Sequence, residues 1–234
     1  MTINATSCFE LSSATHIFSE KVRYWQVHLN LTQEPDIAML QALLPQEQQE
    51  MLRFRQREDR VRFAGVRAAL RKILGTVYHV DPMALIQRDH FGKPELVTPL
   101  GASLAFNVSH SGACGLIAVS QSGQVGVDIE KLSPINVAGL APLICTPSEC
   151  ARLAALSAAA AQDAFYRLWV GKEAALKAVG VGIGGDHMRT IALQDDGRVC
   201  TPDAAPPFDP ALISVQPIVT TDGYCAAVAL YFAP

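Results

Sequence analysis

An internal repeat is the feature of this sequence that most constrains its fold. The segment Arg62–Gly75 (RFAGVRAALRKILG) aligns with Arg167–Gly180 (RLWVGKEAALKAVG), which lies 105 residues later. Three shorter matches accompany it at similar offsets: LPQE with TPSE, FGK with DGR, and SHSGACGLIAVS with TTDGYCAAVALY. Because the matches keep the same order with small changes of offset, they indicate a duplicated unit with loop insertions.

The repeat predicts an α+β pseudodimer, with halves at residues 1–121 and 122–234. Each half should run from a strand and a helix to a long helix ending at Gly75 or Gly180, and then to strands joined by glycine turns. The connection between the halves is expected near Gln121–Gly123. Since ligands commonly bind in a cleft between packed halves, the functional site should draw on both.

Composition argues against several classes of protein. Half of the 234 residues are hydrophobic, which is enough for a sizeable core, and the net charge of −3 argues against general nucleic-acid binding. Uncharged apolar runs stay below the ~20 residues that span a membrane, and no basic leader precedes an apolar core, so we expect a cytoplasmic protein. The six cysteines are scattered without a CxxC pair, which favours reduced thiols and leaves carboxylates as ligands for any metal.

A pair of carboxylates lies in the segment QVGVDIEKL. Strand alternation places Val125 and Val127 on one face and Gly126, Asp128 and Glu130 on the other. An exposed polar strand face is an equally good interpretation of this stretch taken alone. Two adjacent carboxylates repel each other, however, unless a cation or a proton lies between them.

A second set of charges lies in the helical segment WVGKEAALKAVG. Glu173 and Lys177 are i,i+4 neighbours on the face that carries Trp169. Such pairs are usually solvated and contribute roughly 0.3–0.5 kcal/mol, but the apolar neighbours favour a partly buried face with a function. Lys172 is open to two interpretations, a phosphate contact or an ion-pair partner.

Together these residues are typical of a site for a phosphate compound. Asp128, Glu130 and Glu173 would form an oxygen-ligand site for Mg²⁺, which normally also binds substrate phosphates. The window Arg53–Lys72 holds eight basic residues, and arginine side chains suit phosphate oxygens, although a basic helix is most often a solvated face. Neither a GxSxG elbow nor a Walker-type GxxxxGK(S/T) loop is present, which disfavours serine hydrolases and P-loop proteins.

Four motifs occur in a family-like order: FGKPEL (91–96), FNVSHSG (106–112), GVDIEKL (126–132) and FYRLWVGKEAALKAVGVGI (165–183). In these motifs the chain resembles the 4′-phosphopantetheinyl transferases of the Sfp type. The resemblance implies a monomeric pseudodimer that binds coenzyme A and Mg²⁺, or Mn²⁺ in its place, in the central cleft. It also implies transfer of phosphopantetheine to a serine of an acyl or peptidyl carrier protein, with release of adenosine 3′,5′-bisphosphate.

The resemblance also implies a role for each matching residue. Asp128, Glu130 and Glu173 would hold the metal against the diphosphate, and Lys177 would contact the phosphates and assist the leaving group. The residues implied in nucleotide binding are Ser109, His110 and Lys93, with Arg53, Arg62 and Arg88 as looser matches. Glu173 is the first choice of base for the serine hydroxyl, with Glu130 or a metal-bound water as alternatives.

The chain departs from the family pattern just upstream of the basic helix. Prototype bacterial members carry lysines there, where this chain has Glu47 and Glu50. The 3′-phosphate would then depend on arginines. In the repeat, Glu173 aligns with Ala68 and Lys177 with Lys72, which predicts one active site per chain.

Other functions remain compatible with these residues. Three carboxylates and a lysine would equally serve another Mg²⁺-dependent phosphoryl transferase or phosphodiesterase, and a non-catalytic coenzyme A-binding module is a further alternative. The segment KLSPINVAGLAPLICT (131–146) is rich in apolar residues, and we expect some of them, such as Leu140 or Ile144, to receive a helix of the carrier. Fatty-acid, polyketide and nonribosomal-peptide carriers are all compatible with the sequence.

Overall fold

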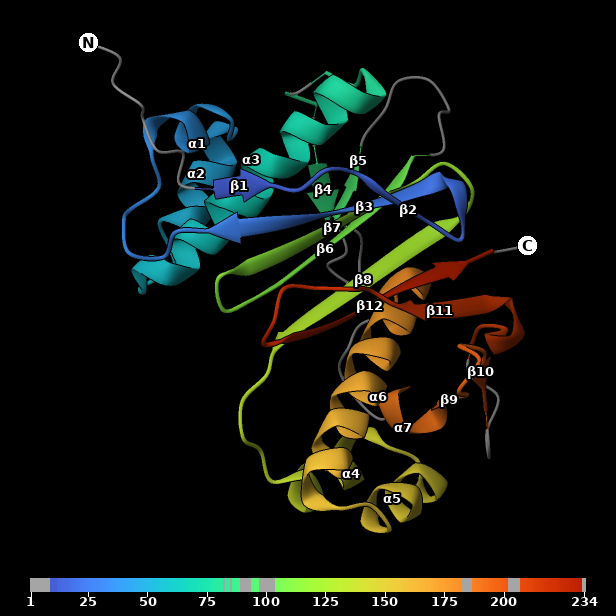
Figure 1. Cartoon of the computed structure of the whole chain (residues 1–234). Helices are drawn as coiled ribbons and strands as arrows, with labels where there is room; N and C mark the ends of the chain where they lie inside the picture. Colours follow the sequence, from blue (N-terminus) through green and yellow to red (C-terminus); the bar gives the residue numbers. More distant parts are fainter. Residues whose placement is uncertain are drawn as a thin grey trace.

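The computed structural model describes residues 9–81, 83–84, 86–88, 94–96, 104–181, 187–201 and 207–232. The chain forms two α+β halves, each with a sheet and one long helix packed on it (Figure 1). The predicted α+β class is therefore confirmed. Within the described residues, no helix is long and apolar enough to cross a membrane.

The first half is built on an antiparallel sheet of order β1-β3-β7-β6, with β2 paired to β3. Strand β3 is the longest and is buried on both faces, since Val22 and Tyr24 lie in one core cluster and Trp25, Val27 and Leu29 in another. The elements of this half are β1 (Phe9–Leu11), β2 (Thr15–Ile17), β3 (Ser19–Leu29), α1 (Ile37–Gln41), α2 (Pro45–Met51), α3 (Arg57–Tyr78), β4 (Ile86–Arg88), β5 (Pro94–Leu96), β6 (Ala105–Ser111) and β7 (Cys114–Ser120).

The second half has a three-stranded antiparallel sheet of order β11-β12-β8 and a small pair β9-β10. Helix α6 is its longest element and crosses the sheet (Figure 1). The elements are β8 (Gln124–Lys131), α4 (Val137–Ile144), α5 (Pro147–Ala154), α6 (Ala158–Val179), α7 (His187–Thr190), β9 (Ala192–Leu193), β10 (Val199–Cys200), the 3₁₀ turn η1 (Pro210–Leu212), β11 (Ile213–Pro217) and β12 (Tyr224–Tyr231).

The two long helices end differently. Helix α6 ends as predicted, because Gly180 takes the left-handed conformation at φ 85°. The prediction that its counterpart ends at Gly75 is wrong, since α3 continues to Tyr78 and His79 takes the left-handed position at φ 55°. The extra turn lets Val77 and Tyr78 pack into the first core, where the Tyr78 ring meets Trp25 edge-on, and this burial outweighs the preference for glycine.

The two halves pack sheet against sheet. Apolar residues of β3 and β7, such as Val22 and Leu116, share one buried cluster with Val125, Val127 and Ile129 of β8. Only residues 121–123 join β7 to β8, at the position where the sequence predicts the connection. The exact limits of the halves stay a prediction.

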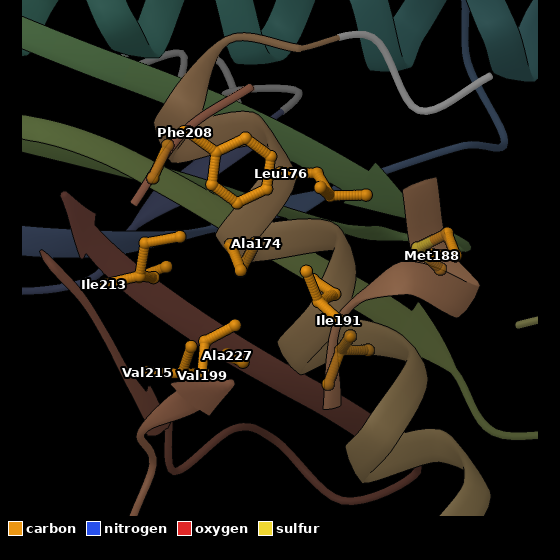
Figure 2. Close-up of a cluster of buried hydrophobic side chains, with 13 residues drawn as sticks. Ala174, Leu176, Met188, Ile191, Val199, Phe208, Ile213, Val215 and Ala227 are labelled. Carbon is orange, nitrogen blue, oxygen red and sulfur yellow. The ribbon is translucent and has the colours of Figure 1, made fainter. Parts of the chain in front are cut away.

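The other face of the second sheet packs against α6. Ala174 and Leu176 of the helix lie over Ile213, Val215 and other residues of the sheet in the cluster drawn in Figure 2. A Cβ atom on Gly126 would lie 2.1 Å from the Ala174 carbonyl oxygen, so only glycine permits this approach of β8 to α6. The approach brings the polar face of β8 beside the charged face of α6.

Candidate active site between the two halves

Asp128 lies at the centre of the site. Its side chain is buried on β8, and its Oδ1 accepts hydrogen bonds from Ser109 Oγ at 2.8 Å and Lys177 Nζ at 2.6 Å. Its Oδ2 is buried as well and has no hydrogen-bond partner in the part of the chain that the structure describes. A buried carboxylate oxygen without a partner is costly, so this atom is suited to a cation or a ligand donor.

Lys177 joins the strand to the helix. Its Nζ also contacts Glu173 Oε2 at 3.3 Å, and Ser109 Oγ at 3.3 Å. Burial disfavours the ammonium form, but the carboxylates of Asp128 and Glu173 outweigh it and raise the pKa of Lys177. Lys177 is therefore a fixed cation between two carboxylates, and the contacts expected from the i,i+4 spacing are present.

Glu173 is held by two neighbours on its own helix. Trp169 Nε1 donates to Glu173 Oε1 at 2.7 Å, while Lys177 contacts the other carboxylate oxygen. Burial and the nearby Asp128 carboxylate raise the pKa of Glu173, and Lys177 offsets this in part. A carboxylate with a raised pKa in a partly buried position is a suitable proton acceptor at neutral pH.

Glu130 faces the same side of β8 but has a different partner. Its Oε2 accepts a hydrogen bond from Ser111 Oγ at 2.9 Å. Burial raises the pKa of Glu130, and the nearby carboxylates of Asp128 and Glu173 raise it further. The three predicted carboxylates therefore influence one another, yet each has a separate hydrogen-bond partner.

A row of polar side chains on β6 supports these acids. Asn107 Oδ1 accepts from the backbone N–H of Val127 at 3.0 Å, and Ser111 Oγ accepts from that of Lys131 at 3.0 Å. With Ser109, these residues alternate along FNVSHSG, so one face of β6 is bonded to β8. Asn107 and Ser111 are site residues that were not predicted, although their i,i+2 spacing with Ser109 is a visible signal in the sequence.

The carboxylates fit a hard metal ion by chemistry. Within the described ranges, no three His, Cys, Asp or Glu side chains are gathered closely enough to hold a metal. The set nevertheless offers oxygen donors from two facing elements, including the unpartnered Asp128 Oδ2, and such donors suit Mg²⁺. The residues therefore fit Mg²⁺ as donors, and Lys177 places a cation between Asp128 and Glu173.

A cavity of about 320 Å³ opens beside these charges, between α3, β6 and α6. Apolar side chains form most of its wall, and its polar groups include Ser109, His110 and Lys177. Burial, together with the positive charges of Arg62 and Lys177, lowers the pKa of His110 and so favours the neutral imidazole. The further lining residues are Phe63, Val66, Arg67, Leu70, Phe106 and Val108.

Most of the basic cluster is already engaged within the protein. Arg62 donates to Gly112 O at 2.7 Å and pairs with Asp59 at 2.7 Å. The other ion pairs of this cluster join Arg57 to Glu58, Arg60 to Glu34, and Arg67 and Arg71 to Glu47. Five of the eight basic residues of this window thus pair with acids within the protein, whereas Arg53, Arg55 and Lys72 are exposed.

Glu47 has a structural role rather than a place at the ligand. It is buried, accepts from Arg71 at 2.7 Å, and lies 3.3 Å from Arg67. Where prototype members of the family carry a lysine, this chain therefore has an acid buried inside the first half. Arg53 is exposed in the loop after α2, outside the wall that the described residues give the cavity. Lys93 and the side chain of Arg88 lie outside the described residues.

The structure distinguishes between the two interpretations of Lys172. Its side chain is fully buried and pairs with Glu149 at 2.5 Å, on the side of α6 away from Asp128. It is an ion-pair partner and not a phosphate contact. Downstream of β8, Leu140 and Ile144 pack into buried clusters, whereas Leu143 of α4 is 67% exposed.

The fold and the site define a protein of two α+β halves, with carboxylates, a lysine and a cavity suited to transferring a phosphate-linked group. Residues 31–122 match the N-terminal family model of 4′-phosphopantetheinyl transferases, and residues 124–229 match the 4′-phosphopantetheinyl transferase superfamily. The chain therefore belongs to the 4′-phosphopantetheinyl transferase family, is of the Sfp type, and transfers 4′-phosphopantetheine to carrier proteins. Members of this family use coenzyme A and Mg²⁺.

Individual relatives agree along most of the chain. The 4′-phosphopantetheinyl transferase HetI of Nostoc sp. is 32% identical over 92% of this chain and 89% of its own length. The 4′-phosphopantetheinyl transferase Sfp of Bacillus subtilis is 29% identical over 85% and 86% respectively. A phosphopantetheinyl transferase of Thraustochytrium sp. is 32% identical over 82% of this chain and 70% of its own length. These matches favour the transferase over the phosphodiesterase and the non-catalytic module.

Proposed function

We propose that this site transfers phosphopantetheine from coenzyme A to a serine hydroxyl of an acyl or peptidyl carrier protein, with release of adenosine 3′,5′-bisphosphate. The observation that carries the proposal is the contact of Lys177 with Asp128 and Glu173 at the mouth of a cavity that also holds Ser109 and His110. These groups come from both halves. A diphosphate placed there meets a lysine on one side and carboxylates on the other.

Asp128, Glu130 and Glu173 would hold Mg²⁺, which supplies neutralisation of the diphosphate charge when it is bound. Glu173 accepts the proton of the serine hydroxyl, because its pKa is raised and Trp169 fixes one of its oxygens. Glu130 remains an alternative proton acceptor. Lys177 donates to the leaving phosphate, since its charged form is stabilised by the carboxylates beside it.

The nucleotide is proposed to enter the cavity between α3 and β6. His110 and Ser109 supply polar contacts there, and the apolar wall accommodates the less polar parts of coenzyme A. A bound phosphate would raise the pKa of His110 by favouring its charged form. Arg53 and Arg62, with Lys93 and Arg88, complete the proposed set for the 3′-phosphate and adenosine.

We propose the exposed Leu143 on α4 as the apolar contact for a helix of the carrier. This residue replaces Leu140 and Ile144, which are partly buried against the core clusters. We further propose that the enzyme acts as a cytoplasmic monomer. The support for a reducing compartment is that all cysteines in the described part of the chain are free.

Replacement of the proposed base tests the function. Glu173→Ala should reduce transfer to a carrier domain at least ~100-fold, since removal of a general base typically costs 10²–10⁴ in rate. Coenzyme A binding should remain measurable. The readout is the mass gain of a purified carrier domain in the presence of Mg²⁺.

Asp163→Ala is the matched control, because Asp163 lies on the same helix, is exposed, and pairs only with Arg167 among the described ion pairs. It should transfer at the wild-type rate. Near-normal turnover by Glu173→Ala would contradict the assignment of the base. Absence of any mass gain with the wild-type protein, across acyl and peptidyl carriers, would contradict the function.

A further inference from the structure

Lys172 is a buried lysine that the proposed reaction does not use. Its Nζ donates to Glu149 Oε2 at 2.5 Å, to Met188 O at 3.0 Å and to Ile144 O at 3.1 Å. All three ammonium donors are thus occupied by acceptors of the protein. A buried charge with a complete set of partners is held in one position, because losing any partner would leave it uncompensated.

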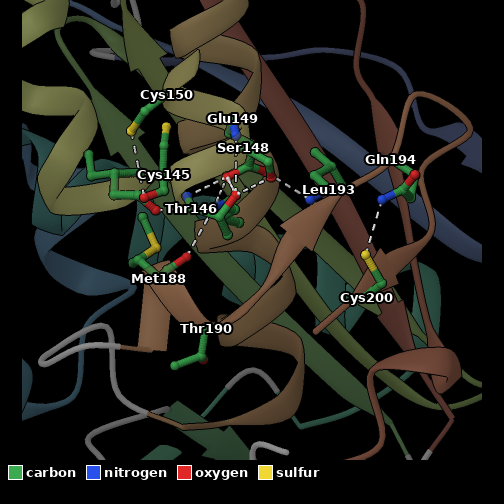
Figure 3. A network of polar contacts seen from close by, with 12 residues as sticks. Cys145, Thr146, Ser148, Glu149, Cys150, Met188, Thr190, Leu193, Gln194 and Cys200 are labelled. Atoms are coloured by element: carbon green, nitrogen blue, oxygen red, sulfur yellow. Dashed lines mark hydrogen bonds and ion pairs between the residues drawn. The ribbon is translucent and has the colours of Figure 1, made fainter. Parts of the chain in front are cut away.

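Glu149 extends this contact to other elements (Figure 3). Its Oε2 also accepts from the Thr146 backbone N–H at 2.8 Å and from Thr146 Oγ1 at 3.1 Å, and its Oε1 accepts from the Leu193 N–H at 3.0 Å. The ion pair therefore joins the end of α4, the start of α5, α6, α7 and β9.

The ion pair Glu149–Lys172 lies next to the proposed base in the chain. Lys172 immediately precedes Glu173, and one residue of α-helix turns the side-chain direction by about 100°, so the two point to different sides of α6. Because a helix turn is rigid, fixing Lys172 fixes the rotation and height of the turn that carries Glu173. Lys177 follows one turn later.

The repeat provides an equivalent without a base. Glu47 aligns with Glu149, Arg67 aligns with Lys172, and Glu47 Oε2 accepts the Leu44 N–H at 2.8 Å just as Glu149 accepts that of Thr146. In the first half Glu47 holds α3 through hydrogen bonds from Arg71 and a 3.3 Å contact with Arg67, and the position equivalent to Glu173 is an alanine. Each half thus has a buried ion pair that holds its long helix, which we call a brace. Only the brace of the second half, Glu149–Lys172, lies next to an acid of the site.

We infer that the buried pair Glu149–Lys172 is a positioning element for the reaction. It touches neither coenzyme A nor the carrier, and it sets Glu173 and Lys177 against Asp128 through the turn of α6. This inference rests on the proposed role of Glu173. A displacement of about 1 Å at a reacting group can reduce a rate on the order of 100-fold, so the loss of the brace should be visible in kcat.

Four variants of the full chain separate positioning from stability. Glu149→Gln and Lys172→Met each leave one buried partner, so both should lower Tm and reduce kcat at least ~10-fold, with the KM for coenzyme A changed less than about twofold. The double variant Glu149→Gln/Lys172→Met leaves no buried charge and should recover most of the Tm. Its kcat should stay low, because the hydrogen bonds from Lys172 to Ile144 O and Met188 O are lost.

Glu47→Gln is the matched control from the first half. It removes the equivalent buried acid and should lower Tm in a similar way. Its partner Arg67 lines the proposed coenzyme A cavity, so any change in activity should fall on the KM for coenzyme A, while kcat remains within about twofold of wild type because α3 carries no base. If the double variant regains kcat together with Tm, the pair contributes stability alone and the inference is wrong. A loss of kcat in Glu47→Gln equal to that of Glu149→Gln would also overturn it.

A spectroscopic readout is independent of turnover. The indole N–H of Trp169 donates to Glu173, so its ¹H–¹⁵N resonance reports the position of that carboxylate, and Trp169→Phe assigns it, since Trp25 is the other tryptophan. The resonance should shift in Glu149→Gln and in the double variant but not in Glu47→Gln. If the resonance does not move in Glu149→Gln and does not move in the double variant, the inference is overturned. If wild-type protein transfers nothing, the proposed function fails, whereas this resonance still decides whether the pair positions Glu173.

Discussion

Lys177 is the residue that organises the site. Its ammonium contacts Asp128, Glu173 and Ser109, and thereby joins β6, β8 and α6. The charges of the two carboxylates would otherwise repel each other across a partly buried space. The lysine is thus needed for stability as well as for its proposed contact with phosphate.

Lys177→Met should therefore destabilise the metal-free protein. Removal of one partner of a buried ion pair typically costs about 3–5 kcal/mol, so we expect the free energy of unfolding to fall by about 3 kcal/mol. Urea unfolding in the presence of a chelator measures it. Lys72→Met, the equivalent change in the first half, alters an exposed residue and should stay within about 0.5 kcal/mol of wild type. Equal losses in both variants would contradict the role of Lys177.

Glu130 gives the site a dependence on pH. Its folded pKa is raised by burial, then by Asp128 and Glu173, so the protonated form is favoured in the folded state. A raised folded pKa contributes stability below the unfolded pKa, and this contribution is lost as pH rises through the folded pKa. Chelated wild-type protein should therefore lose stability relative to Glu130→Gln as the pH rises from the ordinary glutamate range toward neutral.

The measurement is Tm against pH for both proteins in a chelating buffer. The advantage of Glu130→Gln should increase with pH and then become constant. The exposed change Glu20→Gln on β3 should follow the wild-type curve. A difference between Glu130→Gln and wild type that is constant over the whole pH range would show that Glu130 does not titrate as described.

At this scale, periodicity predicted a substantial part of the site. Strand alternation placed Asp128 and Glu130 on one face, and helical spacing brought Glu173 and Lys177 together, as the contacts show. Spacing within one element could not give the partners across elements. The hydrogen bond from Ser111 to Glu130 joins two strands of different halves, and nothing local to either strand specifies that register.

Among the elements, the contact between β8 and α6 places the acids. Gly126 lies directly against the helix backbone, so the spacing of strand and helix is set without an intervening side chain. Because the contact is this close, we expect it to tolerate few substitutions. The acids on β8 and the helix that carries Glu173 move together if the contact opens.

Gly126→Ala should destabilise the protein strongly. Its Cβ would lie 2.1 Å from Ala174 O and 2.3 Å from Ala178 N, which are backbone atoms that cannot rotate away. Overpacking typically costs 1–3 kcal/mol, and we expect a loss of at least about 3 kcal/mol. Thermal unfolding checks this. Gly139→Ala, whose added Cβ approaches no closer than 3.0 Å to the Asn136 side chain, should cost less.

Helix α4 should recognise the carrier through its exposed residue. Leu143→Asp should raise the KM for the carrier by about tenfold, because a buried apolar contact of 1–3 kcal/mol is replaced by a charge. The KM for coenzyme A should not change. Ile37→Asp, at an exposed position of the first half, is the control. Equal carrier KM values for both variants would remove α4 from the interface.

The elements were predictable where the pattern is local. The end of α6 at Gly180 and the alternation of β8 followed from neighbouring residues. The end of α3 did not, because packing of Val77 and Tyr78 against the sheet extends the helix past Gly75. The long-range ion pairs of the basic cluster were also not predictable, since Glu34 and Glu47 are remote in the chain from their partners.

For the whole molecule, the two halves are alike in architecture and unlike in chemistry. Each has a long helix braced by a buried acid, but Glu173 has only Ala68 as its equivalent. The acids on β8 likewise belong to the second half. The asymmetry follows from the repeat and supports a single site per chain.

Binding should therefore saturate at one coenzyme A per chain. Isothermal titration in the presence of Mg²⁺ measures the stoichiometry, and sedimentation measures the mass of the same sample. We expect a ratio of one in a monomer. A ratio of two would mean that the first half also forms a site, and a ratio of one half would indicate a site shared between two chains.

The order of strands in the second sheet also determines when the protein can fold during synthesis. Strand β12 lies at the centre of that sheet, between β11 and β8, yet it is the last strand of the described chain. Until it emerges from the ribosome, β8 has no partner within its sheet, and the apolar face of β3 and β7 lacks the part of its cover that Ala226, Val228 and Leu230 of β12 supply. A nascent chain stalled before Tyr224 therefore exposes an apolar surface that chaperones can bind. Folding of the two halves is expected to finish together.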